Sequence, residues 1–196
     1  SQVPAYQLPA VLVSADGRPV STADQWFHVR RPQILALFGN LIYGVVPSPE
    51  TPIRTTFEVM KTDRGFMSGR ATRKDVHIRF ENAKGSADLL ILVFTPNDAK
   101  GPVPAFQLNS FSNTRDNGHD VSPDRPDFLR NGVPLGEFLK RGFGFVVVPQ
   151  GDLVRHNEVE FQKGIHPLFY RSSQSFPKAS EWGCISAVAW GTSRAL

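Results

Sequence analysis

The chain has 196 residues, 40% hydrophobic and 20% charged, with a net charge of +4. This composition excludes a disordered or fibrous protein and fits one globular domain with a buried core. No apolar run approaches the roughly 18 residues that cross a membrane, so no membrane partner is expected. The basic residues are scattered, with at most two together as at Arg30 and Arg31. The sequence therefore predicts no nucleic-acid partner and no stripe for another polyanion.

Cysteine and histidine usage gives no sign of a disulfide or a metal site. Cys184, the single cysteine, cannot form an internal disulfide and is predicted to be a buried, unreactive thiol. The five histidines include no pair with H-x-H or H-x-x-x-H spacing, so no metal ligands are assigned. The sequence also lacks the glycine-rich phosphate-binding motifs G-x-G-x-x-G and G-x-x-x-x-G-K-[ST]. We therefore expect no cofactor.

A helix is predicted to begin near Ala23. Thr22 and Gln25 have the spacing of a capping box, in which a hydroxyl and a side-chain amide satisfy free backbone groups at a helix start. Gly44 and Pro47 end the pattern. We expect one face of this helix to pack against another part of the protein, because apolar residues recur at helical spacing. These residues are Ile34, Leu35, Phe38, Leu41 and Ile42.

Five extended segments follow. Residues 53–61 and 76–81 alternate between apolar and polar side chains, which predicts half-exposed antiparallel strands. Three short apolar runs predict strands covered on both faces, and we expect them to form a buried parallel core. These runs are 89–94, 104–108 and 143–148. Between the last two lie a turn-rich loop, 109–131, and a helix, 133–141, that Gly142 closes.

The last quarter of the chain is predicted to hold an ordered loop and a helix. The loop runs from the end of the strand at Val148 to Ser180, and its apolar side chains indicate that it is ordered. The helix is expected over 180–196, with Ser180 as its N-cap and with Trp182, Ile185, Ala189 and Trp190 on one face. No capping residue closes this helix, and residues 1–196 do not include the strand that a β-α-β pattern would place after it. We therefore expect the chain to be the front part of a larger α/β domain.

Residues 1–196 contain no recognisable nucleophile of an α/β enzyme. The G-x-S-x-G turn that exposes a catalytic serine is missing. Ser193 follows Gly191 but lies at the end of the predicted helix, without the strained turn that such a serine needs. We therefore assign no catalytic residue.

The two long loops hold the remaining candidates. Residues 109–113 combine short polar side chains with one aromatic ring, which suits either sugar or ester binding or an ordinary Asn- and Ser-rich turn. His119, His156 and His166 also lie in these loops, where each could act as a base or touch a substrate. A structural role in holding the loop is favoured for all three.

Several segments together resemble the bacterial glucuronoyl esterases, the fifteenth carbohydrate esterase family. The stretch 20–26 is followed by RRPQILALF at 30–38 and YGVVP at 43–47. LNSFSN at 108–113 resembles that family's L-N-F-G-G-N loop, and FQKGIHPLFY at 161–170 resembles its Q-N-G-V-H-P-L-F-Y segment. EWGCISAVAWGTSRAL at 181–196 is similar to the helix that precedes the family's nucleophile strand.

This resemblance implies an α/β fold, an α/β-hydrolase three-layer sandwich, of which residues 1–196 form the N-terminal half without the nucleophile strand. It implies a serine esterase that cleaves the ester between 4-O-methylglucuronate on xylan and lignin alcohols. The family's serine, histidine, catalytic acid and main glucuronate-binding residues would lie downstream of Leu196. Within the chain we assign Phe111 and Asn113 to the substrate-facing rim. Asp152, His166 and Trp182 are expected to support substrate binding or to hold the loops.

The partners expected from the resemblance are a glucuronoxylan-lignin ester or a small glucuronate ester, and the remainder of the same domain. A polymeric substrate implies a secreted or periplasmic protein. Ser110 and Ser112 depart from the family pattern, and 113–130 is short, so the substrate range stays open. Two alternatives remain: an acetylxylan esterase-like hydrolase of the same fold, and a carbohydrate-binding fragment without catalysis.

Overall fold

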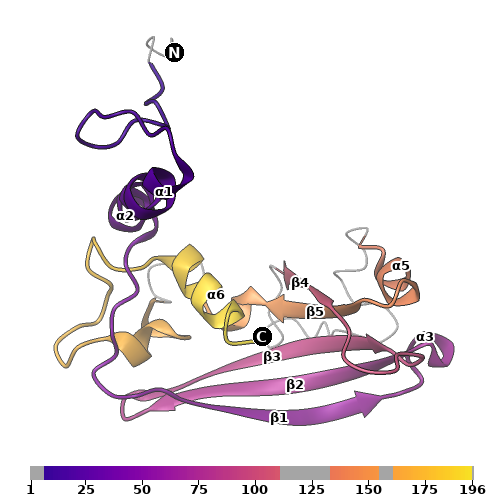
Figure 1. Cartoon of the computed structure of the whole chain (residues 1–196). Coiled ribbons are helices and arrows are strands. Elements are labelled where there is room, and N and C mark those ends of the chain that lie inside the picture. The colour runs from indigo at the N-terminus through magenta and orange to yellow at the C-terminus, as the bar shows by residue number, and fades with distance from the viewer. Residues whose placement is uncertain (1–6, 111–132, 155–160, 196) are drawn as a thin grey trace, which may run out of the picture.

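The protein is built around a five-stranded mixed sheet (Figure 1). A computed structural model describes residues 7–110, 133–154 and 161–195. The strand order is β1-β2-β3-β5-β4. The strands are β1 (Arg54–Asp63), β2 (Ala71–Asn82), β3 (Gly85–Pro96), β4 (Ala105–Ser110) and β5 (Gly144–Pro149). The α-helices are α1 (Ala23–Gln25), α2 (Arg31–Phe38), α3 (Phe66–Gly69), α5 (Leu135–Lys140) and α6 (Cys184–Thr192).

The strand directions confirm one prediction and correct another. β1, β2 and β3 form an antiparallel meander, as the alternating patterns of 53–61 and 76–81 predict. The expected parallel core is wrong in part: β3 runs antiparallel to β5, and only β4 and β5 are parallel. A two-residue turn between Asn82 and Gly85 reverses the chain into β3. An unbroken apolar run reports burial on both faces, which helices over an antiparallel strand produce equally well.

Each face of the sheet has its own apolar core, so the described residues form three layers. One core joins Leu89, Ile91 and Val148 to α6, to residues 153–154 and to residues between 165 and 182. The other joins Leu92, Phe94 and neighbouring strand residues to α3 and α5. Successive residues of β3 point to opposite faces, which is why both sets are buried. α5 ends at Lys140 and is closed, as the sequence predicts, by Gly142, which has a φ of +82°.

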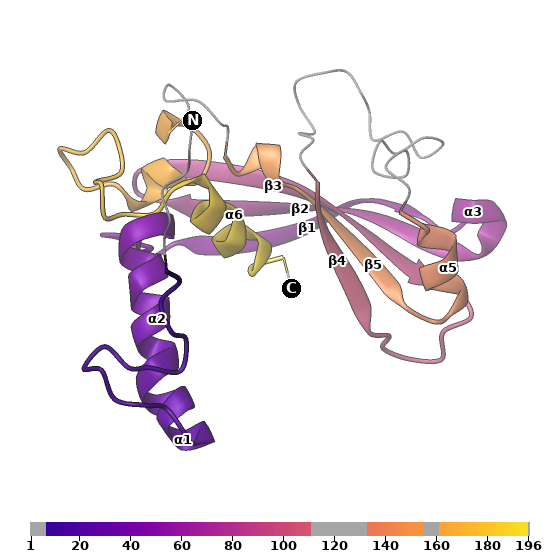
Figure 2. The same ribbon diagram turned by 90° about the horizontal axis from the view of Figure 1, so that it is seen from above.

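The N-terminal helical segment stands away from the sheet (Figure 1 and Figure 2). The capping box is confirmed, since Gln25 N donates to Thr22 Oγ1 and Thr22 N donates to Gln25 Oε1, both at 3.2 Å. Two π-helical stretches flank α2, η1 (Trp26–Arg30) and η2 (Gly39–Tyr43). The predicted packing of its apolar face is not met within the described residues. Leu35, Phe38, Leu41 and Ile42 are all exposed there.

The last helix differs from its prediction in start, face and ending. Residues 180–183 bond to the extended chain after η2 instead of entering the helix, since Val45 N donates to Ser180 O and Trp182 N donates to Val45 O. The helix therefore begins at Cys184. Its buried face holds Ala187, Val188 and Gly191, whereas Ile185 and Ala189, expected inside, are exposed. It ends at Thr192 in a tightened turn, although no glycine or asparagine caps it.

The backbone is strained at α3. Met67 and Ser68 have φ values of 54° and 60°, in the left-handed region that side chains disfavour. Gly69 continues this conformation with φ +80°. Asn97 holds the turn against the sheet, because its Nδ2 donates to the carbonyls of Arg64 and Gly69 at 3.0 and 2.8 Å.

Candidate active-site edge

The carboxyl ends of β4 and β5 define the candidate site, because open α/β sheets bind ligands at this edge. β4 ends at Asn109 and Ser110, and β5 leads into a 3-10 turn, η3 (Gln150–Asp152). Thr192 Oγ1 donates to Asn109 Oδ1 at 3.2 Å and so joins the end of α6 to the end of β4. Three separate elements thus converge on one edge.

Asp152 lines a small polar cavity at this edge. The cavity has a volume of about 160 Å³. Asp88 and Asp152 contribute carboxylates to it, and Lys163 contributes an amine. Asp88 belongs here because β3 runs antiparallel to β5, which brings the start of β3 to the carboxyl end of β5. The described lining offers hydrogen-bond acceptors and one cation, which suit hydroxyl groups.

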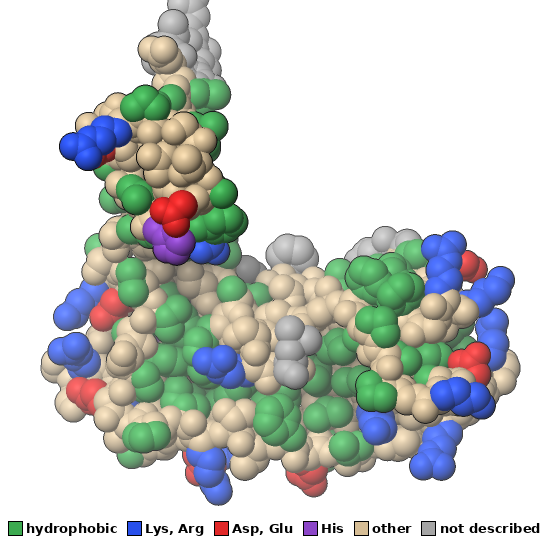
Figure 3. Space-filling model, in the orientation of Figure 1, with side chains coloured by type: hydrophobic (Ala, Val, Ile, Leu, Met, Phe, Trp, Pro, Cys, Tyr) green, Lys and Arg blue, Asp and Glu red, His purple; other side chains and the backbone are tan. Residues whose placement is uncertain are grey.

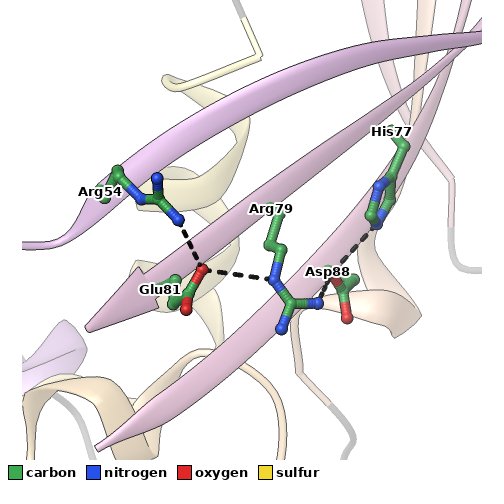
Figure 4. Close-up of polar contacts among 5 residues, drawn as sticks. All are labelled: Arg54, His77, Arg79, Glu81 and Asp88. Carbon is green, nitrogen blue, oxygen red and sulfur yellow. Dashed lines mark hydrogen bonds and ion pairs between the residues drawn. The ribbon is translucent and has the colours of Figure 1, made fainter. Parts of the chain in front are cut away.

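A ladder of charged side chains crosses the sheet next to this cavity (Figure 4). Asp88 Oδ1 lies 3.0 Å from His77 Nε2 and 3.2 Å from Arg79 Nη1. Glu81 continues the ladder, 3.6 Å from Arg79 Nε and 3.1 Å from Arg54 Nη2. The ladder fixes the Asp88 carboxylate from two sides and so defines one wall of the cavity.

His166 lies in an aromatic cluster beneath the edge. Its ring centroid is 4.8 Å from that of Phe161 and 5.1 Å from that of Trp182. His166 and Trp182 are both 0% exposed, and neither ring nitrogen of His166 has a hydrogen-bond partner among the described residues. Burial lowers the pKa of His166 to about 4, an effect that the nearby backbone of Trp182 opposes in part. The ring is therefore neutral at pH 7, and its contacts hold the loop in place.

The loop around this cluster is ordered, as its apolar content predicts. His166 lies in the 3-10 helix η5 (His166–Phe169). Ile165 N donates to Leu153 O at 3.0 Å, and Asn82 Nδ2 donates to Leu168 O at 2.8 Å. Gly164 is required at its position, since it has φ +67° and a Cβ would lie 2.1 Å from Leu153 O. The loop is thus tied both to the end of β5 and to the end of β2.

Burial also raises the pKa of two other side chains, Tyr170 and Cys184. The hydroxyl of Tyr170 donates to Phe161 O at 2.6 Å, and burial raises the pKa of Tyr170. Burial raises the pKa of the Cys184 thiol as well, which fits the expected unreactive thiol. Ser193 donates to the Trp190 carbonyl at 2.7 Å from an exposed position at the end of α6, and not from a turn between a strand and a helix.

The predicted site residues fall in different places. His166 and Trp182 pack together, whereas Asp152 lines the cavity, to which neither of them contributes among the described lining residues. Phe111 and Asn113 lie outside the described residues, as do His119 and His156. The roles of all five site residues in substrate binding stay predictions.

Sequence reasoning missed Asp88, Lys163 and the Asn109 to Thr192 contact. Only the reversal of β3 brings Asp88 to this edge, and no sequence signal marks it. Among the described residues, no group of three or more His, Cys, Asp or Glu side chains could hold a metal ion. No described helix has the length and apolar character of a membrane span.

The mixed sheet with helices on both faces fits the predicted α/β class. No protein-family model matches the sequence. The chain is 30% identical to carbohydrate esterase MZ0003 from an unknown prokaryotic organism, over 221 residues that take in 100% of this chain and 50% of that protein.

Solved structures of esterases also superimpose on the chain, and they confirm the predicted α/β-hydrolase fold. A glucuronoyl esterase from Solibacter usitatus superimposes with a TM-score of 0.83 at 31% identity, covering 99% of this chain and 53% of that one. A promiscuous CE15 esterase from a marine bacterial metagenome gives 0.73 at 28% identity, with the same coverage. The resemblance to the glucuronoyl esterases of carbohydrate esterase family 15 is thereby confirmed. The chain spans about half the length of these relatives.

Proposed function

We propose that the chain belongs to a carboxylic ester hydrolase that cleaves 4-O-methylglucuronoyl esters between glucuronoxylan and lignin alcohols. The observation that carries the proposal is the superposition of 99% of the chain on a glucuronoyl esterase at 31% identity. The relative 30% identical in sequence is itself named a carbohydrate esterase. The assembled carboxyl edge of β4 and β5 supports the proposal, because hydrolases of this fold place their chemistry there.

In the proposed mechanism a serine carried by a segment after Leu196 attacks the ester carbonyl. A histidine takes the proton of the serine and passes it to the departing lignin alcohol. Water then attacks the acyl-enzyme, and the serine regains its proton as the glucuronic acid leaves. The remainder of the same domain, which supplies these groups, is thus the proposed partner of residues 1–196. His166 is an unsuitable base, because it is fully buried in the aromatic cluster.

The function is tested on the full-length protein with the benzyl ester of 4-O-methylglucuronic acid, by measuring release of benzyl alcohol. We expect turnover of this ester and little release of acetate from acetylated xylan. Release of acetate with no cleavage of the benzyl ester would instead support the acetylxylan esterase alternative. Binding to xylan fragments without cleavage of either ester would support the non-catalytic alternative.

Asp152 gives a sharper test of the edge. If the cavity at Asp152 supports the substrate, D152N lowers kcat/KM on the benzyl ester by about tenfold, through a lost charged hydrogen bond. D24N, an exposed carboxylate change on the N-terminal helix, is the matched control and leaves kcat/KM unchanged. Equal values for D152N and D24N would remove Asp152 from the substrate site.

The proposed location is the periplasm or the cell exterior, because the polymeric substrate does not enter cells. Fractionation of a native host, with the protein recovered only from the cytoplasm, would contradict this.

A further inference from the structure

Two hollows lie side by side at the opposite end of the sheet from the candidate active-site edge. The larger, about 570 Å³, is bounded by α3, by the chain after β3 and by α5. The smaller, about 440 Å³, lies against β2 and the end of β3. Asn97 lines both and separates them. The Asn97 side chain is fixed between the hollows. Its Nδ2 donates to the carbonyls of Arg64 and Gly69, and its Oδ1 accepts from Thr72 Oγ1 at 2.5 Å.

The hollows gather three basic side chains of the stretch 64–74 with one from α5. Arg70 and Lys140 line the larger hollow, and Arg64 and Lys74 line the smaller one. Asp98 is the one acidic residue among the described lining residues. Figure 3 shows Lys and Arg side chains crowding this end of the molecule, around α3 and α5. The expectation of a scattered basic surface thus holds for the sequence but not for the fold.

These four cations are exposed and free to meet a ligand. Within the described parts of the chain, none of them forms a salt bridge, whereas Arg73 nearby is paired with Asp75 at 2.6 Å. The only side-chain hydrogen bond described for them runs from Arg70 Nε to the Met67 carbonyl at 3.1 Å, which fixes the guanidinium at the rim. Unpaired like charges held together repel one another, and an anionic ligand relieves that repulsion.

The rest of the lining narrows the class of anion. Thr62 and Thr95 supply hydroxyls, and Asp98 supplies an acceptor for hydroxyl donors. A carboxylate beside the cations disfavours a ligand of uniformly dense negative charge, such as a nucleic acid. No aromatic residue is among the described lining residues, so nothing there would stack on bases. The mixture suits a chain of neutral sugars that carries carboxylates at intervals.

We propose that the two hollows form a binding site for an acidic polysaccharide that bears free uronic acid groups. The site rests on the proposed function for its ligand class, since the relatives act on glucuronoyl esters. It lies beyond the amino ends of β4 and β5, about 17 Å from their carboxyl ends at the rise of a six-residue strand. A polymer bound there leaves the active-site edge open, so the protein can stay on its substrate between cleavages.

The test measures binding of the full-length protein to a xylo-oligosaccharide carrying 4-O-methylglucuronic acid, by isothermal titration calorimetry at low salt. A neutral xylo-oligosaccharide of equal length and a single-stranded DNA oligonucleotide are the comparison ligands. We expect binding to the acidic sugar only. The double variants R64Q/K74Q and R70Q/K140Q should each weaken it about tenfold, at some threefold per exposed charge.

R31Q/K178Q removes two exposed charges at the other end of the molecule and serves as the matched control. It should bind the acidic sugar like the parent protein. Equal binding of the neutral sugar, equal or tighter binding of DNA, or equal weakening by the control would each overturn the proposal. Hydrolysis of the benzyl ester is measured in the same parent preparation. Binding without hydrolysis therefore contradicts the proposed function alone, and hydrolysis without binding contradicts this site alone.

Discussion

Replacing His166 with phenylalanine should make the free energy of unfolding decrease less between pH 7 and pH 4. The folded-state pKa of His166 is about 4, whereas the ordinary value of a histidine is 6.5. The unfolded chain therefore binds a proton more readily than the folded protein. Above pH 6.5 His166 is neutral in both states, and the folded state keeps its full stability. As the pH falls from 6.5 toward 4, the unfolded chain takes up the proton first, and the free energy of unfolding decreases. At about 1.4 kcal/mol for each tenfold difference in proton affinity, His166 destabilises the fold by about 3 kcal/mol at pH 4 relative to pH 7.

Phenylalanine keeps an aromatic ring between Phe161 and Trp182 and removes two ring nitrogens that have no hydrogen-bond partner in the part of the chain that the structure describes. H166F should therefore match the parent protein within about 1 kcal/mol at pH 7, because apolar replacement of unpartnered polar atoms is nearly neutral. At pH 4 it should be more stable than the parent by about 3 kcal/mol. Urea unfolding at pH 4, 5, 6 and 7, followed by tryptophan fluorescence, measures the difference.

The matched control is H28Q, since His28 is an exposed histidine on the N-terminal helix. It should follow the pH dependence of the parent. If H166F and the parent lose stability in parallel between pH 7 and pH 4, then His166 is not buried as described, and the reasoning fails.

Three further changes test the backbone and the packing. S68G should stabilise the protein by up to about 1 kcal/mol in urea unfolding, because glycine adopts φ +60° without strain; a destabilised S68G contradicts the left-handed turn. G191A should destabilise by about 1–3 kcal/mol, since a Cβ would lie 2.4 Å from Leu153 Cδ1; G101A, at an exposed position with no described atom within 4 Å, is its control and should be near neutral. T22A should lower amide protection in 23–30 by about 1 kcal/mol in hydrogen exchange, and unchanged protection would exclude the capping box.

Local signals predicted most of the elements. The Thr22 and Gln25 spacing gave the helix start, and alternation gave β1 and β2, because both patterns act within a few residues. The start of α6 was missed because residues 180–183 bond to Tyr43 and Val45, far away in the sequence. Such a contact overrides the local preference of Ser180 for a helix cap, and no local pattern reveals it.

Of the candidate site, only the place of Asp152 could be predicted, and its role in substrate binding stays a prediction. Asp152 follows a buried strand and lies at the edge where that strand ends, as expected of a functional loop. Asp88 joins it only through the antiparallel pairing of β3 with β5. Lys140 joins the three cations of 64–74 only through the fold, since it is more than sixty residues away in the sequence. Periodicity describes which face a residue takes but not which distant residues share that face.

The order in which the strands join the sheet has a consequence for folding. Asn82 pairs with Gly85 across a hairpin, whereas Ala105 must find Gly144 across a long intervening segment. Closing a longer segment costs more chain entropy, and non-local pairing slows folding. We therefore expect the meander to form early and the parallel pair to form late. During synthesis, the edge of β3 would stay unpaired until β5 is made. Nascent chains could aggregate through this edge.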